Sequence, residues 1–143
     1  MYPNHEKDFY GWVLTNARLL KQKKYDEADM DKIIEEIETL GRSNKRELVS
    51  RSGVLIAHLL KWQYQAAIRN SSWEGTIERQ RIEINDLLDE NPSLKSHIQE
   101  ALPKAYKYAL SILKEETPID LKLLPSQCPY TFDEIMDEGF YPS

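Results

Sequence analysis

The stretch Val54–Leu60 is the longest apolar run in the chain, and only His58 interrupts it. It lies within a longer segment, from Met30 to about Gln65, whose apolar residues largely recur at helical spacing. A helix that is apolar on nearly every side must be covered by other elements, whereas a bilayer span would need about 20 apolar residues. The sequence therefore predicts that this segment is the central helix of a soluble helical protein.

Three further segments show helical periodicity. A first helix is predicted from about Asp8 to Lys24. A third helix is predicted to begin at Ser71–Glu74, because the sequence SSWE is typical of a capping box. It should end before Asn91, where Asn91 can cap a fourth helix that has Pro92 in its first turn. Pro103 lies inside this fourth helix and is expected to kink it.

The second helix is predicted to carry one continuous apolar stripe, formed by Ile33, Ile37, Leu40, Leu48, Leu55 and Leu59. Asp26 or Asp29 can cap its start. The stripe is polar between Gly41 and Glu47, so a break or kink near Gly41 is considered. Thr131–Glu134, a second capping box, predicts a short final helix after an irregular segment.

These elements predict an all-α fold with one domain over residues 1–143. The expected architecture is an antiparallel four-helix bundle with a long second helix and a C-terminal strap ending in a short helix. The single cysteine, Cys128, excludes an internal disulfide and favours a reducing compartment. Met1–Asp8 has no apolar signal segment, so the expected location is the cytoplasm, without a membrane partner.

Charge is segregated along the chain. Residues 26–40 carry seven acidic side chains and one basic one, whereas residues 41–82 carry eight basic and three acidic ones. Residues 115–143 again carry seven acidic side chains and one basic one. A basic middle segment could bind a polyanion, but neutralisation by the acidic segments within the fold is the simpler interpretation.

Four short segments carry a resemblance to a known family. They are Asp8–Trp12 (DFYGW), Glu35–Ser43 (EEIETLGRS), His58–Tyr64 (HLLKWQY) and Cys128–Thr131 (CPYT). Their order and spacing resemble the bacterial proteins of domain-of-unknown-function family 29, over essentially the whole chain. The resemblance implies a small helical bacterial protein, and it brings no activity, substrate or cofactor. Pro103 departs from the helix-forming residue expected at that point.

Arg51 and His58 are the most specific candidates for a catalytic site. Seven residues turn a helix by about 700°, so the two side chains share one face. This arrangement resembles the Arg-x₆-His motif of the HEPN ribonucleases, in which histidine works beside a phosphate that arginine binds. Histidine can move a proton near neutral pH, and arginine can stabilise phosphate charge. The structural alternative is a boundary histidine hydrogen-bonded to a carboxylate of the acidic stretch, with Arg51 held by Glu47.

Two other kinds of site are considered. Lys61, Trp62, Gln63 and Tyr64, with Arg69, Trp73, Arg79 and Arg81, interleave aromatic and basic residues as single-strand nucleic-acid binders do. Burial of Trp62 and Trp73 in the core is favoured over this binding surface. His58 and Glu36 are weak candidates for a metal site, since no spacing of metal-ligand type supports one. Cys128 is expected to be a packed anchor of the strap rather than a nucleophile.

No convincing catalytic set emerges from these patterns, and no cofactor is expected. The leading hypothesis is a non-enzymatic helical module that acts by protein–protein contact, including contact with its own copies. A HEPN-like ribonuclease that uses Arg51 and His58 is the alternative. A metal-dependent enzyme within the bundle is the third hypothesis.

Overall fold

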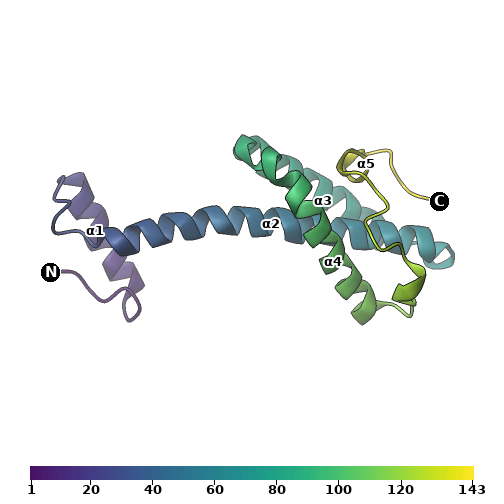
Figure 1. The fold of residues 1–143 in the computed structure, drawn as a ribbon, viewed down its shortest axis with the longest axis horizontal. Helices are drawn as coiled ribbons and strands as arrows, with labels where there is room; N and C mark the ends of the chain where they lie inside the picture. Colours follow the sequence, from purple (N-terminus) through teal and green to yellow (C-terminus); the bar gives the residue numbers. More distant parts are fainter. The chain divides into compact units, whose positions relative to one another are not determined.

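A computed structural model describes all 143 residues, and every regular element in it is helical. The α-helices are α1 (Phe9–Lys21), α2 (Met30–Tyr64), α3 (Ser71–Glu90), α4 (Ile98–Glu116) and α5 (Phe132–Met136). Short 3₁₀ helices occupy the connections at Ala66–Ile68, Pro92–His97 and Leu121–Leu123. The predicted all-α class is confirmed, with a long second helix and a short last one (Figure 1).

The chain divides into two compact units, unit 1 (Met1–Arg42) and unit 2 (Ser43–Ser143). Unit 1 contains α1 and the first part of α2, and unit 2 contains the rest of α2 with all later elements. Helix α2 is continuous through Gly41, so the break considered there does not occur. The expectation of one domain stays a prediction.

The core of unit 2 forms around the second half of α2, which packs against α3 and α4 (Figure 1). Fully buried side chains of α2 in this core are Leu48, Leu55, Ile56, Leu59 and Leu60. Residues that cover them from α3, α4 and α5 include Ile77, Ile84, Ala105, Ala109, Leu113 and Ile135. The apolar run of α2 is therefore enclosed on several sides, as its composition predicts.

Helices α2 and α4 lie close together at Gly53. A Cβ atom added at Gly53 would lie 2.5 Å from Cδ2 of Tyr108 and 3.0 Å from the carbonyl oxygen of Ala105. The neighbouring Ser52 is buried, and its hydroxyl oxygen has no hydrogen-bond partner. Only a residue without a side chain fits this crossing without displacing its neighbours.

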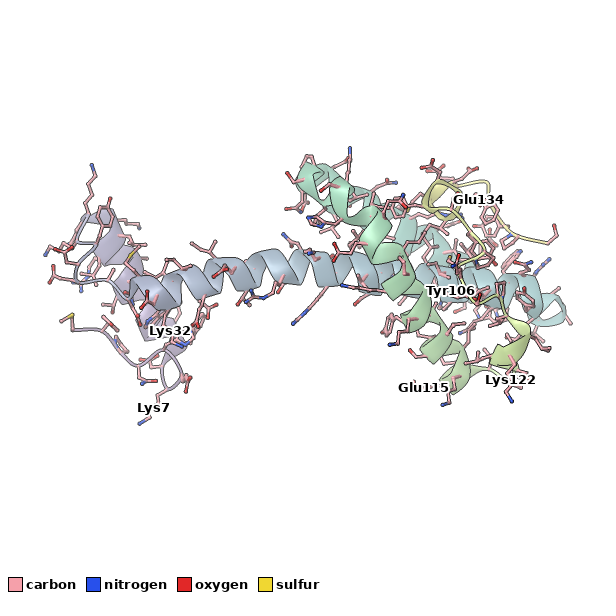
Figure 2. All side chains as sticks on the ribbon, in the orientation of Figure 1. Lys7, Lys32, Tyr106, Glu115, Lys122 and Glu134 are labelled. Atoms are coloured by element: carbon pink, nitrogen blue, oxygen red, sulfur yellow. The ribbon has the colours of Figure 1, made fainter.

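The C-terminal strap (residues 117–143) is held by a buried arginine of α3. Arg81 donates hydrogen bonds to the carbonyl oxygens of Ile135 (2.7 Å), Phe140 (2.7 Å) and Glu138 (3.3 Å). Burial lowers the pKa of the Arg81 guanidinium, and these carbonyl groups compensate for its lost hydration. The hydroxyl of Tyr106, labelled in Figure 2, binds the strap at a second point, the carbonyl oxygen of Pro125.

The predicted cap of the third helix differs from the structure by one residue. Asn70, not Ser71, caps α3, because its side-chain oxygen accepts a hydrogen bond from the backbone N–H of Trp73 (2.9 Å). Asparagine is as good a cap as serine, and its position one residue earlier lets Ser71 join the helix. The capping box at Thr131–Glu134 forms as predicted and starts α5.

The fourth helix begins later than its proline predicts. Residues Pro92–His97 form a 3₁₀ turn, and α4 starts at Ile98 with Pro103 inside it. The side chain of Asn91 makes no capping bond. It donates instead to the carbonyl oxygen of Leu87 (3.0 Å), while its own oxygen accepts from Asn44 (3.3 Å).

In unit 1, polar contacts tie α1 to the start of α2. The indole N–H of Trp12 donates to Asp29 (2.9 Å), whose backbone N–H donates to the side chain of Asn16 (2.7 Å). His5 contacts Glu36 at 2.7 Å. His5 lies before α1, and its ring packs on that of Trp12 with 4.6 Å between ring centres, so this contact joins the segment before α1 to α2. Helix α1 crosses the start of α2 obliquely (Figure 1). Helix α1 ends three residues before the predicted Lys24.

The single apolar stripe predicted along α2 is wrong in its first half. Leu48, Leu55 and Leu59 are buried, but Ile37 is 62% exposed and Leu40 is 67% exposed. Within unit 1 only α1 packs beside this part of α2, and one short helix cannot cover the whole stripe. The apolar residues have the helical spacing that the sequence predicts, but no element of unit 1 covers Ile37 and Leu40.

Gly53 and Gly41 offer a matched test of the helix crossing. Gly53→Ala should lower the free energy of unfolding by about 1–3 kcal/mol, because the methyl group collides with Tyr108 and the α4 backbone. Gly41→Ala meets no atom within 4 Å and should raise it by up to about 1 kcal/mol through helix propensity. Urea denaturation measures both effects. Equal effects at the two positions would contradict the close approach.

Candidate functional site

His58 lies beside a hollow of about 310 Å³ between α2 and α4. Its Nδ1 is 2.8 Å from the carbonyl oxygen of Val54, so the expected carboxylate partner is wrong and the backbone satisfies the ring. Nδ1 therefore carries the proton, and Nε2 is left as an acceptor. Burial lowers the pKa of the imidazole, so it is neutral at neutral pH. The remaining lining residues are Tyr108, Ile112, Glu115 and Glu116. The ring could accept a proton, but acidic side chains rather than cations share its hollow.

Arg51 is directed toward α3. Its guanidinium contacts Glu47 (2.7 Å), Gln80 (3.3 Å) and Glu83 (3.7 Å). The hollow that Arg51 lines, of about 420 Å³, includes Gln80 but not His58. The Glu47 contact is the one expected for a structural arginine.

Arg51 and His58 thus share a helix face but not a hollow. Val54 lies between them and contributes to both depressions. A ribonuclease would need both side chains at one phosphate. Their observed partners draw the guanidinium toward α3 and leave the imidazole beside α4, and the ribonuclease hypothesis stays untested by this geometry.

The predicted binding segment Lys61–Tyr64 contacts other parts of unit 2. Lys61 is buried and contacts Glu116 (3.2 Å), and Gln63 accepts a hydrogen bond from Tyr130 of the strap (2.6 Å). Tyr64 remains exposed. These contacts tie Lys61 to α4 and Gln63 to the strap, so neither side chain is left free for a ligand.

The two tryptophans beside this segment are half-buried rather than fully enclosed. Trp62 packs on Tyr141, with ring centres 4.9 Å apart, and the guanidinium of Arg69 lies 5.0 Å from its ring centre. Trp73 lies in the first turn of α3, with the ammonium of Lys61 5.9 Å from its ring centre. Both rings pack against the fold, with part of each left exposed at its edge.

The weak metal candidates are not brought together as a pair. Glu36 contacts His5 within unit 1, whereas the residues that line the hollow of His58 belong to unit 2. No group of three or more histidine, cysteine, aspartate or glutamate residues is placed to hold a metal ion. Cys128 packs against the core, and burial raises the pKa of its thiol, which suits the predicted anchor.

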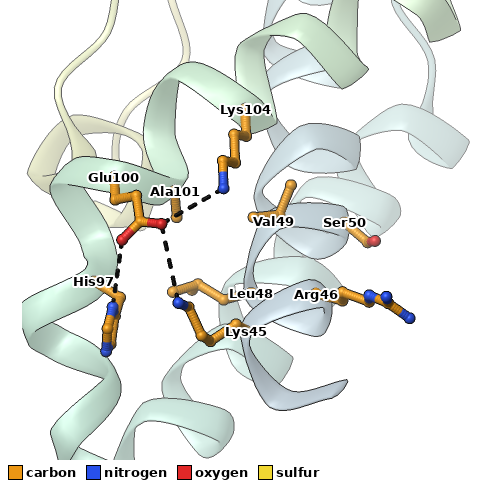
Figure 3. Close-up of a pocket in the computed structure, with 9 residues that line it drawn as sticks. All are labelled: Lys45, Arg46, Leu48, Val49, Ser50, His97, Glu100, Ala101 and Lys104. Carbon is orange, nitrogen blue, oxygen red and sulfur yellow. Dashed lines mark hydrogen bonds and ion pairs between the residues drawn. The ribbon is translucent and has the colours of Figure 1, made fainter. Parts of the chain in front are cut away.

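A third hollow, of about 300 Å³, lies between α2 and the start of α4 (Figure 3). Glu100 lines it and contacts His97 (3.5 Å), Lys104 (3.5 Å) and Lys45 (3.9 Å). These neighbours, His97 first, hold the pKa of the Glu100 carboxyl below its usual range. The arrangement could bind an anion over an apolar floor, but any such anion would compete with Glu100.

Sequence reasoning missed this cluster. The spacings His97 to Glu100 and Glu100 to Lys104 are helical neighbours, and they could have been recognised from the sequence. Lys45 comes from another helix, so no local pattern indicates its contribution.

Most of the exposed large apolar side chains belong to unit 1. Helix α1 exposes Tyr10 (73%), Val13 and Leu14 (52%), and the first part of α2 exposes Met30, Ile34 (49%) and Ile37. These six residues are called the apolar face below. By contrast, the large side chains buried in unit 1 are Trp12, Asn16 and Leu19. Sequence reasoning placed several of these residues on apolar stripes but did not anticipate their exposure.

The comparison with protein families gives a clear result. The model for "Domain of unknown function DUF29" matches residues 4–141. The chain belongs to this family. No curated protein and no solved structure matches this DUF29 chain. No helix of this DUF29 protein is both long enough and apolar enough to cross a membrane.

His58 predicts a pH dependence of stability. Its folded-state pKa is lowered from 6.5, so its stabilising contribution is present above about pH 6.5 and is lost as the pH falls through the lowered value. The free energy of unfolding should therefore fall between about pH 7 and pH 5, and His58→Gln should reduce that slope. Urea denaturation at several pH values measures it. His97→Gln is the control and should leave the pH dependence of the free energy of unfolding that His58 produces unchanged. If His97→Gln reduced this dependence and His58→Gln did not, the assignment to His58 would be wrong.

Proposed function

We propose that the protein is a non-enzymatic protein–protein interaction module whose docking surface is the apolar face of unit 1. The observation that carries this proposal is the exposure of six large apolar side chains on two helices of a 42-residue unit. Soluble proteins rarely expose a contiguous apolar surface of this kind without a binding role. Unit 2 supplies the folded core that anchors the second half of α2.

The residues of the apolar face lie on the exposed sides of α1 and of the first part of α2. Successive residues turn a helix by about 100°, so Tyr10, Val13 and Leu14 lie roughly 100–160° around α1 from the buried Trp12. Met30, Ile34 and Ile37 lie roughly 80–140° around α2 from Asp29, the residue that Trp12 contacts. Both rows are therefore left free by the contact between α1 and α2.

Unit 1 also lacks the interior that would make it self-sufficient. Folded units of about 40 residues usually need oligomerisation, metals or disulfides to be stable. Unit 1 is joined by the polar contacts of Trp12, Asn16 and Asp29 and has few buried apolar side chains. Covering the apolar face with a partner would supply the missing apolar burial.

The other hypotheses lack a comparable observation. A ribonuclease would need Arg51 and His58 to act on one phosphate, and the contacts of Arg51 lead toward Glu47 and α3 instead. A nucleic-acid surface would need free cations at Lys61 and Arg81, which are both buried. These contacts favour the interaction module.

Site-specific photo-crosslinking in the native host tests the proposal. A photoreactive amino acid at Leu14, in the apolar face, should form covalent adducts with protein, because this position is covered in the functional state. The same group at Ile82, an exposed apolar residue of α3 in unit 2, is the matched control and should give far fewer adducts. Denaturing gels and mass spectrometry measure both.

Crosslinks that depend on the Leu14 position support a protein-docking face, whatever the partner is. If Leu14 gives no more adducts than Ile82, the proposed function is wrong.

A further inference from the structure

We propose that the apolar face of unit 1 binds the same face of a second copy of this chain, so that two copies of unit 1 cover each other's exposed apolar side chains. This inference rests on the proposed function, and it names the partner. Each copy would supply α1 and the first part of α2, with the six residues of the apolar face forming the new core. Such a two-fold contact uses the same surface on both chains.

Opposite charges on the two helices favour self-association. Residues 9–24, which contain α1, carry four basic side chains and no acidic one. Residues 26–40, which contain the first part of α2, carry seven acidic side chains and one basic one. A second copy therefore offers an acidic helix to the basic one and a basic helix to the acidic one.

The charged residues that matter lie along the margins of the apolar face. Arg18 and Lys21 follow Leu14 by four and seven residues, which places them beside its row on α1. On α2, Asp31 precedes Ile34 by three residues and Glu38 follows it by four. These four charged side chains have no ion-pair partner within the chain. They lie on the outer margins, away from the contact between α1 and α2.

Charge also selects between the two-fold arrangements. A two-fold contact that places α1 of one copy against α2 of the other brings the basic and acidic margins together. A two-fold contact that places α1 against α1 and α2 against α2 makes like charges face each other. Because like-charge pairs are unfavourable, the first arrangement is the one proposed.

The first experiment measures the mass of the full chain by sedimentation equilibrium at micromolar concentrations. The wild type should be a dimer, and Leu14→Glu with Ile34→Glu should shift it to a monomer with unchanged helical circular dichroism. Ile82→Glu with Leu123→Glu alters two exposed apolar residues of unit 2 and should leave the dimer intact. A monomeric wild type, or a dimer that survives the Leu14 and Ile34 substitutions, would overturn the proposal.

The second experiment reverses the charges of the side chains along the margins of the apolar face. One variant carries Arg18→Glu and Lys21→Glu, and the other carries Asp31→Lys and Glu38→Lys. Each should self-associate about tenfold or more weakly than the wild type, because all its margins now have one sign of charge. An equimolar mixture should form a heterodimer, in which every basic margin meets an acidic one. A mixture that associates no better than the separate variants would overturn the proposed pairing.

Failure of this inference is distinguishable from failure of the proposed function. A monomeric wild type whose Leu14 position crosslinks to a different protein overturns the second copy as occupant and leaves the docking face standing. A monomeric wild type without Leu14 crosslinks overturns both. A dimer that the Leu14 and Ile34 substitutions dissociate supports both.

Discussion

Burial of the second half of α2 is the constraint on which unit 2 depends. Val54–Leu60 is apolar on nearly every side, so this helix is stable in water only when several elements cover it. Helices α3 and α4 and the strap provide that cover, and Gly53 lets α4 approach closely. Arg81 fixes the strap by donating its buried hydrogen bonds to backbone carbonyl groups. The hollows beside Arg51 and His58 lie at the margins of this packing.

The same helix meets a different environment in unit 1. Its first half has α1 beside it, joined through Trp12 and Asp29, and the apolar face stays exposed. One continuous helix therefore combines a segment that its own chain encloses with a segment that exposes apolar side chains. The proposed interaction module rests on this contrast, because exposed apolar side chains on two helices are the feature of unit 1 that its own chain leaves uncovered.

Local patterns predicted the local structure. Periodicity placed the four long helices, and Thr131–Glu134 predicted its capping box, because both depend on residues a few positions apart. Periodicity could not say what covers Ile37, since that depends on which element packs there. Arg81 was grouped with surface cations because residue type does not indicate burial. The contact of Glu100 with Lys45 joins two helices and has no sequence signature.

The central claim is that unit 1 is completed by association, whereas unit 2 is complete in one chain. Amide hydrogen exchange of the full-length protein, followed by mass spectrometry at low and high protein concentration, tests this claim most directly. Protection of the α1 amides should rise with concentration, because association covers unit 1, while protection in α3 and α4 should stay constant. Protection of α1 that is the same at both concentrations, across a range that spans the association, would contradict the account.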